Sequence, residues 1–338
     1  MSVSLNGTNG LTFNDASVQN TAATEFGFKN RIINGAQIVD QRNAGASVTP
    51  TSGQYLTDRF VAALSVASKF TAQQTPSTTE TGFAVRVGAG FTNYLACTSS
   101  SAYSVLTGDY FAIQQYVEGL NITDLAWGTA SAKTVTLSFQ AYSSLTGTFG
   151  GALSNSAQNR SYPFIYSIPT ANTWTTISVT IAGDTSGTWL TTNGIGIRLT
   201  FGLGVGTTYS GTANSWAGST YLSATGATSV VGTNGATFYI TGVQLEKGST
   251  ATSFDYRPYG TELMLCQRYY STSGNTNMCV GTASGYASYS FPVEMRATPT
   301  VTVSATAGSN TVNSPGTRGF YVFSTALNNF GYTSTIEL

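Results

Sequence analysis

The sequence predicts an all-β protein in which two antiparallel sheets stack face to face. Apolar residues alternate with polar ones over much of the chain, turn-forming residues fill the stretches between, and no segment carries a helical apolar stripe over three turns. The 338 residues include 37 glycines, and only 8% are charged. This composition is typical of many short strands joined by turns, and the chain is long enough to bury a core without metals or disulfides.

The alternation is clearest at residues 195–205. Every second residue there is apolar, while Arg198, Thr200 and two glycines share the other face. Four more segments show the same alternation and are predicted as strands: 60–66, 83–89, 135–141 and 177–181. Because burial on one side only is typical of antiparallel sheets that cover a core, two such sheets are expected to form a sandwich.

Three parts are predicted along the chain. Residues 1–30 are rich in Asn, Thr and Ser and have too few apolar residues to fold alone, so we interpret them as an extended N-terminal arm. Residues 31–257 carry most of the strand patterns and are predicted to form the sandwich. Pro and Gly then mark a boundary, and residues 258–338 are predicted to form a smaller β domain. Its expected strands are 286–293, 300–305, 319–325 and 332–338, while the helix-like stretch 261–270 fits either assignment.

The residue types exclude much common catalytic chemistry. The chain has no His, which removes Ser-His-Asp and Cys-His catalysis and His-ligated metals. Its three cysteines, Cys97, Cys266 and Cys279, are too scattered for a zinc site and are expected to be small buried residues of a protein made in a reducing cytoplasm. Two carboxylates could still form a glycosidase pair, but we expect the acids to serve turns, caps and Arg partners. We therefore predict no enzymatic activity, no cofactor and no metal.

Charge limits the expected partners. The 14 basic residues balance 14 acidic ones, which argues against binding to nucleic acid or to an anionic membrane surface. The first ten residues, MSVSLNGTNG, contain neither a basic region nor an apolar stretch, so we expect no signal peptide and no membrane insertion. A zero net charge also leaves little repulsion between copies of the chain.

Aromatic residues are the main resource for binding. The chain contains 19 Tyr and 18 Phe, and such rings can stack on the apolar faces of sugars. A predicted long loop at 206–235 carries Tyr209, Trp216 and Tyr221, and long loops are usually functional or mobile. Tyr110 and Tyr116 are expected on the outer face of their strand. We take these five residues as candidate glycan contacts; the alternative is that they pack between subunits or under loops.

Several segments resemble bacteriophage tail-fibre and appendage proteins. Residues 29–36 (KNRIINGA) with 39–43 (VDQRN), and then 55–60 (YLTDRF), resemble the first two strands of the jelly-roll domain of such proteins. The other segments that carry the resemblance are 11–19 (LTFNDASVQ), 237–246 (TFYITGVQLE), 247–259 (KGSTATSFDYRPY), 260–270 (GTELMLCQRYY) and 291–303 (FPVEMRATPTVTV). The central domain also resembles carbohydrate-binding jelly rolls, although no motif matches a sugar-contacting residue or a calcium ligand.

The resemblance implies a jelly-roll subunit of a tail fibre or spike that is assembled in the host cytoplasm and binds host surface polysaccharide. The N-terminal arm would attach to other virion proteins, with Leu5, Leu11 and Phe13 as candidate contacts. We expect a homotrimer, because low charge and exposed strand edges need partners and fibres favour three copies. Two alternatives stay open: a purely structural head, neck or tail decoration protein, and a capsule depolymerase that uses two carboxylates.

Overall fold

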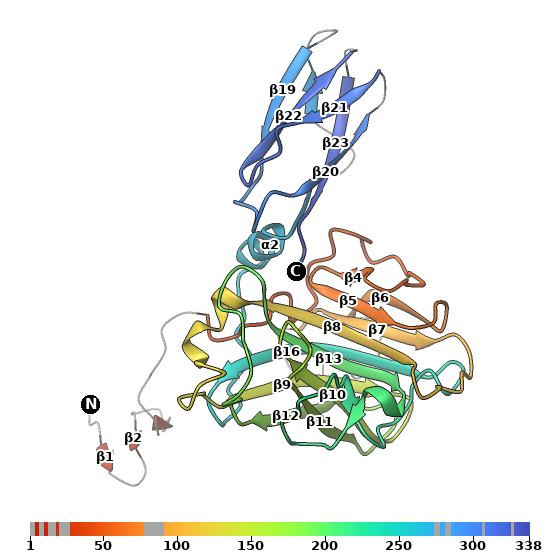
Figure 1. Ribbon diagram of the computed structural model, residues 1–338, viewed down its shortest axis with the longest axis vertical. Helices are drawn as coiled ribbons and strands as arrows, with labels where there is room; N and C mark the ends of the chain where they lie inside the picture. Colours follow the sequence, from red (N-terminus) through yellow and green to blue (C-terminus); the bar gives the residue numbers. More distant parts are fainter. Residues whose placement is uncertain are drawn as a thin grey trace.

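The fold is nearly all β, as the sequence predicts, and is built around a jelly-roll sandwich of two antiparallel sheets (Figure 1). The computed structural model describes residues 4–6, 10–12, 18–19, 28–77, 91–273, 278–280, 285–305, 308–325 and 328–338. The predicted strand at 83–89 and the candidate attachment residue Phe13 lie outside these residues. A smaller pair of sheets projects from one side of the sandwich (Figure 1).

One sheet of the sandwich has six strands in the order β11-β10-β13-β8-β5-β4, and every adjacent pair is antiparallel. Its strands are β4 (Tyr55–Thr57), β5 (Phe60–Leu64), β8 (Tyr110–Glu118), β10 (Gly147–Ser154), β11 (Ser161–Ile168) and β13 (Ile195–Val205). The facing sheet has five strands in the order β12-β9-β16-β7-β6. These are β6 (Phe70–Pro76), β7 (Asn93–Ser99), β9 (Val135–Ser143), β12 (Thr175–Ile181) and β16 (Thr237–Lys247).

The core lies between these two sheets and follows the alternation seen in the sequence. On β13 the inner set Ile197, Leu199, Phe201 and Leu203 is fully buried. Phe139 of β9 contacts Phe201 edge-on, with 5.1 Å between ring centroids, so the sheets interlock at this point. Complete burial of one such side chain contributes roughly 2 kcal/mol, so the sandwich core is the main stabilising element of the chain.

The N-terminal segment contains three short strands, β1 (Ser4–Asn6), β2 (Gly10–Thr12) and β3 (Val18–Gln19), which pair as a small antiparallel sheet. Leu5 and Leu11 are direct partners in the register of β1 and β2. No pattern in the sequence predicts this pairing, because two- and three-residue strands are too short to show an alternation.

The helix-like stretch after the boundary is a helix, α2 (Tyr259–Gln267). It begins directly after Pro258, whose carbonyl accepts the first helical hydrogen bonds from the backbone N–H of Thr261 and Glu262 at 2.9 and 3.1 Å. The other helical elements among the described residues are short 3-10 turns at η2 (Gly119–Asn121), η3 (Thr123–Leu125) and η4 (Thr207–Tyr209).

Two sheets follow α2. One is formed by β17 (Tyr270–Thr272), β18 (Met278–Val280), β20 (Thr300–Ala305) and β23 (Asn328–Thr335), and the other by β19 (Gly285–Ser290), β21 (Asn310–Asn313) and β22 (Gly319–Ser324). They enclose a separate small core of Phe291, Met295, Phe320, Val322 and Tyr332. The strand predicted at 286–293 ends at Ser290, before Pro292, which has no N–H to donate to a ladder.

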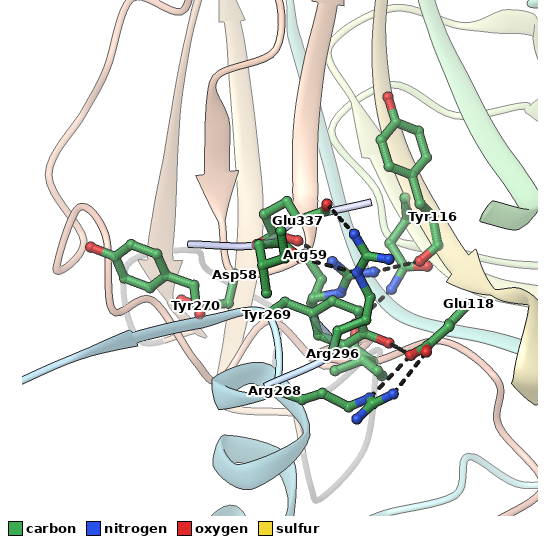
Figure 2. A network of polar contacts seen from close by, with 12 residues as sticks. Asp58, Arg59, Tyr116, Glu118, Arg268, Tyr269, Tyr270, Arg296 and Glu337 are labelled. Carbon is green, nitrogen blue, oxygen red and sulfur yellow. Dashed lines mark hydrogen bonds and ion pairs between the residues drawn. The ribbon is translucent and has the colours of Figure 1, made fainter. Parts of the chain in front are cut away.

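A buried polar network joins these distal sheets to the sandwich (Figure 2). Arg59, which is 1% exposed, pairs with Glu337 near the end of the chain and donates to the Tyr116 carbonyl at 2.7 Å. Glu337 also accepts a hydrogen bond from Arg42. Arg296 donates to the backbone carbonyl of Glu337 at 2.9 Å. The last residues of the chain are therefore fixed to the first strands of the sandwich.

A second set of contacts lies beside the first in Figure 2. Arg268, just after α2, donates to both carboxylate oxygens of Glu118 at 3.1 and 2.8 Å. The Tyr269 hydroxyl donates to the same carboxylate at 2.6 Å, and the Tyr269 ring lies 3.6 Å beneath the Arg59 guanidinium. Arg59 is thus held by Glu337, by the Tyr116 carbonyl and by the Tyr269 ring. Because a planar guanidinium fixed on all these sides has little freedom, this junction is expected to be rigid.

Candidate functional site

An open groove of about 430 Å³ lies on the outer face of the six-stranded sheet. Its floor comes from β5, β8 and β13, and its walls come from the loop before β4, the β10–β11 turn and the 206–235 loop. The lining residues are Ser52, Gly53, Ala62, Ala63, Tyr110, Gln114, Tyr116, Gln158, Arg198, Tyr209, Thr220 and Leu222.

Strand pairing places the polar side chains of the floor. Phe111, Ile113 and Val117 of β8 belong to the core, so the alternating residues between them face outward into the groove. Arg198 of β13 lies directly opposite Tyr116 in the β8–β13 register. The floor is therefore part of a rigid sheet, which holds its side chains in fixed positions.

The loop at 206–235 forms one wall of the groove, and hydrogen bonds to β10 and β11 hold it in place. Its backbone N–H groups at Asn214 and Thr228 donate to the carbonyls of Pro163 and Thr148, each at 2.7 Å. Within the loop, the two-residue strands β14 (Ser210–Gly211) and β15 (Ser223–Ala224) pair in parallel.

Two glycines of the six-stranded sheet allow the 206–235 loop to pack closely against it. A Cβ at Gly150 of β10 would overlap the Ser223 hydroxyl, and one at Gly202 of β13 would lie 3.1 Å from it. The loop therefore packs on the β10 side of the sheet and leaves the β8 and β5 side open as the groove.

Aromatic and polar groups combine inside the groove. Tyr110 and Tyr209 meet edge to face, with 5.3 Å between ring centroids. The Arg198 guanidinium lies 4.6 Å from the centroid of the Tyr116 ring. The Tyr116 hydroxyl donates to Gln114 Oε1 at 2.9 Å, and burial raises the pKa of Tyr116, an effect that the nearby Arg198 opposes only in part. The hydroxyl therefore stays protonated at neutral pH.

The structure brings three of the five candidate residues together. Tyr110, Tyr116 and Tyr209 line the groove, whereas Trp216 and Tyr221 do not. Trp216 is partly buried within a cluster of tryptophans, with ring centroids 5.5 Å from both Trp127 and Trp189, and its Nε1 donates to the Ala182 carbonyl at 2.8 Å. The Tyr221 ring packs against Gly211 of the same loop. Both residues lie in the wall loop rather than in the groove.

Sequence reasoning missed five polar residues of the groove: Ser52, Gln114, Gln158, Arg198 and Thr220. Arg198 belongs to the outward set of the clearest strand pattern, and Gln114 lies between the two outward tyrosines of its strand. A search for polar residues that share an outer face with tyrosines would have found these two. Gln158 and Thr220 come from loops whose positions are set by tertiary contacts, such as the 2.7 Å hydrogen bond from Thr220 Oγ1 to the Gln158 carbonyl.

Two acids that could have contributed to a carboxylate pair, Asp184 and Glu118, have structural partners instead. Asp184 accepts two hydrogen bonds from Arg160, at 2.8 and 2.6 Å, and Glu118 is held at the junction. Within the part of the chain that the structure describes, no group of three or more His, Cys, Asp or Glu could hold a metal ion. No helix in that part is both long and apolar enough to span a bilayer.

Comparisons with known proteins give distant structural neighbours. No family model matches the chain, and no curated protein matches it. A solved structure of the enzymatically active domain of tailspike protein 4 from bacteriophage CBA120 is 12% identical, with a TM-score of 0.34, over 65% of this chain and 22% of that one. The chain thus matches about a fifth of the length of that tailspike structure.

Two further neighbours are named for sugar binding. A putative sugar-binding protein from Bacteroides thetaiotaomicron is 14% identical with a TM-score of 0.36, over 65% of this chain and all of the neighbour. A family 4 carbohydrate-binding module is 16% identical with a TM-score of 0.31, over 64% of this chain and 99% of the neighbour.

Proposed function

We propose that this chain is a glycan-binding protein and that the groove on the six-stranded sheet is its binding site. The observation that carries the proposal is the grouping of Tyr110, Tyr116 and Tyr209 with Gln114 and Arg198 in one open groove. Aromatic rings can stack on the apolar faces of a sugar, while amide and guanidinium groups hydrogen-bond its oxygens. A groove that is open along a sheet suits an internal stretch of a polysaccharide better than a small molecule that must be enclosed.

The groove supports binding rather than hydrolysis. Among the described residues that line it, none is Asp or Glu. Glycoside hydrolysis usually needs two carboxyl groups that flank the scissile bond. The proposed role is therefore recognition without turnover, and incubation of the protein with a bound polysaccharide should release no new reducing ends.

The wider role that we propose is that of a tail-fibre or spike subunit of a phage virion, which binds host surface polysaccharide. The support is the sequence resemblance of the segments at 29–43, 55–60 and 237–270. In this proposal the N-terminal arm, with Leu5, Leu11 and Phe13, contacts other virion proteins. Three copies of a weak groove would give avidity without a tight single site, and mass measurement of the purified protein would detect the expected trimer.

The test of the site compares groove tyrosines with a tyrosine elsewhere. We expect Tyr110→Ala and Tyr209→Ala each to weaken binding to a glycan panel about tenfold, because each removes an aromatic contact surface. Tyr286→Ala is the control, since Tyr286 is 72% exposed on the distal sheets, away from the groove. Binding that survives both groove variants, or a wild-type protein that binds no glycan, would reject the groove as the site.

A further inference from the structure

Arg198 is the only charged residue among the described residues that line the groove. Most other arginines that the structure describes have a carboxylate partner, as Arg160 does in Asp184 and Arg268 in Glu118. Within that part of the chain no carboxylate lies within 4.0 Å of the Arg198 guanidinium. The groove therefore carries a positive charge that the protein itself does not neutralise.

The orientation of this arginine is set by its neighbour. Its guanidinium lies 4.6 Å from the centroid of the Tyr116 ring, and its Nε is shielded from solvent without a hydrogen-bond partner. A guanidinium that rests on a ring loses less freedom when it binds a ligand, and its planar fork matches the two oxygens of a carboxylate.

We propose that the groove selects acidic glycans and that Arg198 pairs with the carboxylate of a uronic or ulosonic acid residue. This inference rests on the proposed function and names its ligand class. The positive charge also attracts polyanions to the groove although the whole chain has zero net charge. A sulfated sugar would offer the same negative charge in a tetrahedral group, so the experiment must separate the two.

The test uses oligogalacturonate, its fully methyl-esterified form and sulfated dextran as probes. We expect esterification to weaken binding to the wild-type protein about tenfold or more, because it removes the charge but keeps the sugar rings. Arg198→Gln should weaken binding of oligogalacturonate to a similar degree and weaken binding of the ester much less, because the ester loses only a hydrogen bond to the guanidinium and no charge pair. The affinity of Arg198→Lys for oligogalacturonate should lie between those of the wild type and Arg198→Gln, because lysine keeps the positive charge and loses the planar fork.

The matched control is Arg318→Gln, which removes the same charge from a side chain that is 84% exposed on the distal sheets. It should bind oligogalacturonate as the wild type does. The esterified probe needs no variant, so the test does not depend on how well Arg198→Gln folds, and thermal melting checks that variant separately.

The outcomes separate this inference from the proposed function. If the ester binds as well as the acid, while Tyr110→Ala weakens both, the groove binds sugars but the acidic preference is wrong. If sulfated dextran binds through Arg198 and oligogalacturonate does not, the carboxylate assignment is wrong. If Tyr110→Ala and Arg198→Gln both leave binding unchanged, the groove is not a glycan site and both proposals fail. If none of the three probes binds while other glycans of the panel do, only the acidic preference is wrong.

Discussion

At the scale of single residues, one carboxylate beside the groove stands out. Asp109 precedes Tyr110 and accepts hydrogen bonds from the Tyr103 hydroxyl at 2.8 Å and from the Leu106 N–H and Ser65 hydroxyl at 3.0 Å. The Tyr103 hydrogen bond, helped by the other two, holds the pKa of Asp109 below its ordinary value. Asp109 therefore binds a proton less readily in the folded chain than in the unfolded one.

Because the pKa of Asp109 is lower in the folded chain than in the unfolded chain, the stability of the protein depends on pH in a known direction. Stabilisation from Asp109 is fully present above its unfolded pKa of about 3.9 and is lost as the pH falls through its folded value. We expect Asp109→Asn to lower the free energy of unfolding by about 1 kcal/mol at neutral pH, through weaker hydrogen bonds. The variant should also lose less stability than the wild type below about pH 4, which urea titrations at several pH values would measure. Parallel pH curves for the two proteins would contradict the assignment.

Cysteine reactivity gives a second prediction at this scale. Cys97 and Cys266 are fully buried, and burial raises the pKa of both thiols. Because the thiolate is the reactive form, neither residue should react with a maleimide at about pH 8 until the protein unfolds. Peptide mapping after labelling, with and without urea, would show this, and rapid labelling of either residue in the folded protein would disprove it.

The residue scale also shows how far the sequence could predict the site. Period-two alternation correctly placed Tyr110 and Tyr116 on an outer face. The meeting of Tyr116 with Arg198 depends on the register between two strands that are far apart in the chain, and no local pattern encodes that register. The position of Tyr209 depends likewise on how the 206–235 loop packs on the sheet.

At the scale of elements, the strands with regular alternation were predictable and the helix was not. The segments at 60–66, 135–141, 177–181 and 195–205 all contain strands. In α2 the apolar residues are consecutive, and Met264 is 49% exposed, so no apolar stripe marks the helix. The helix is held instead by tertiary contacts, among them the hydrogen bond from the Asn34 backbone N–H to the buried Glu262 carboxylate.

The close packing of the 206–235 loop can be tested through one glycine. We expect Gly150→Val to destabilise the protein by about 1–3 kcal/mol, because the new side chain would overlap Ser223 and push the loop from the sheet. Hydrogen exchange should rise in residues 207–225, and glycan binding should weaken because Tyr209 belongs to the same wall. Gly218→Ala is the control, since a Cβ there meets nothing within 4 Å. Unchanged exchange in Gly150→Val would show that the loop does not depend on this contact.

At the scale of the whole molecule, the junction of Figure 2 joins the sandwich to the distal sheets. Its central contact is Glu337 between Arg42 and the buried Arg59. Removing one partner of a buried pair is costly because it leaves the other charge without compensation.

We expect Glu337→Gln to lower the free energy of unfolding by about 3 kcal/mol and to expose the 268–273 segment to limited proteolysis. Glu294→Gln is the matched control, because Glu294 pairs with Arg318 at the surface, where both side chains are more than half exposed. The control should unfold at the same urea concentration as the wild type, because a solvated ion pair contributes little to stability. Equal effects of the two substitutions would mean that the junction is no stronger than a surface ion pair.

The return of the chain to this junction has a practical consequence. The Ile336 N–H donates to the Tyr269 carbonyl at 2.9 Å, and β17 pairs with the end of β23, so the segment that enters the distal sheets and the segment that leaves them lie side by side at one base (Figure 1). The distal sheets can therefore be exchanged as a cassette. A graft has to match only one pair of neighbouring ends, and a new tip that keeps Arg268 and Glu337 could be mounted without redesign of the body that carries it.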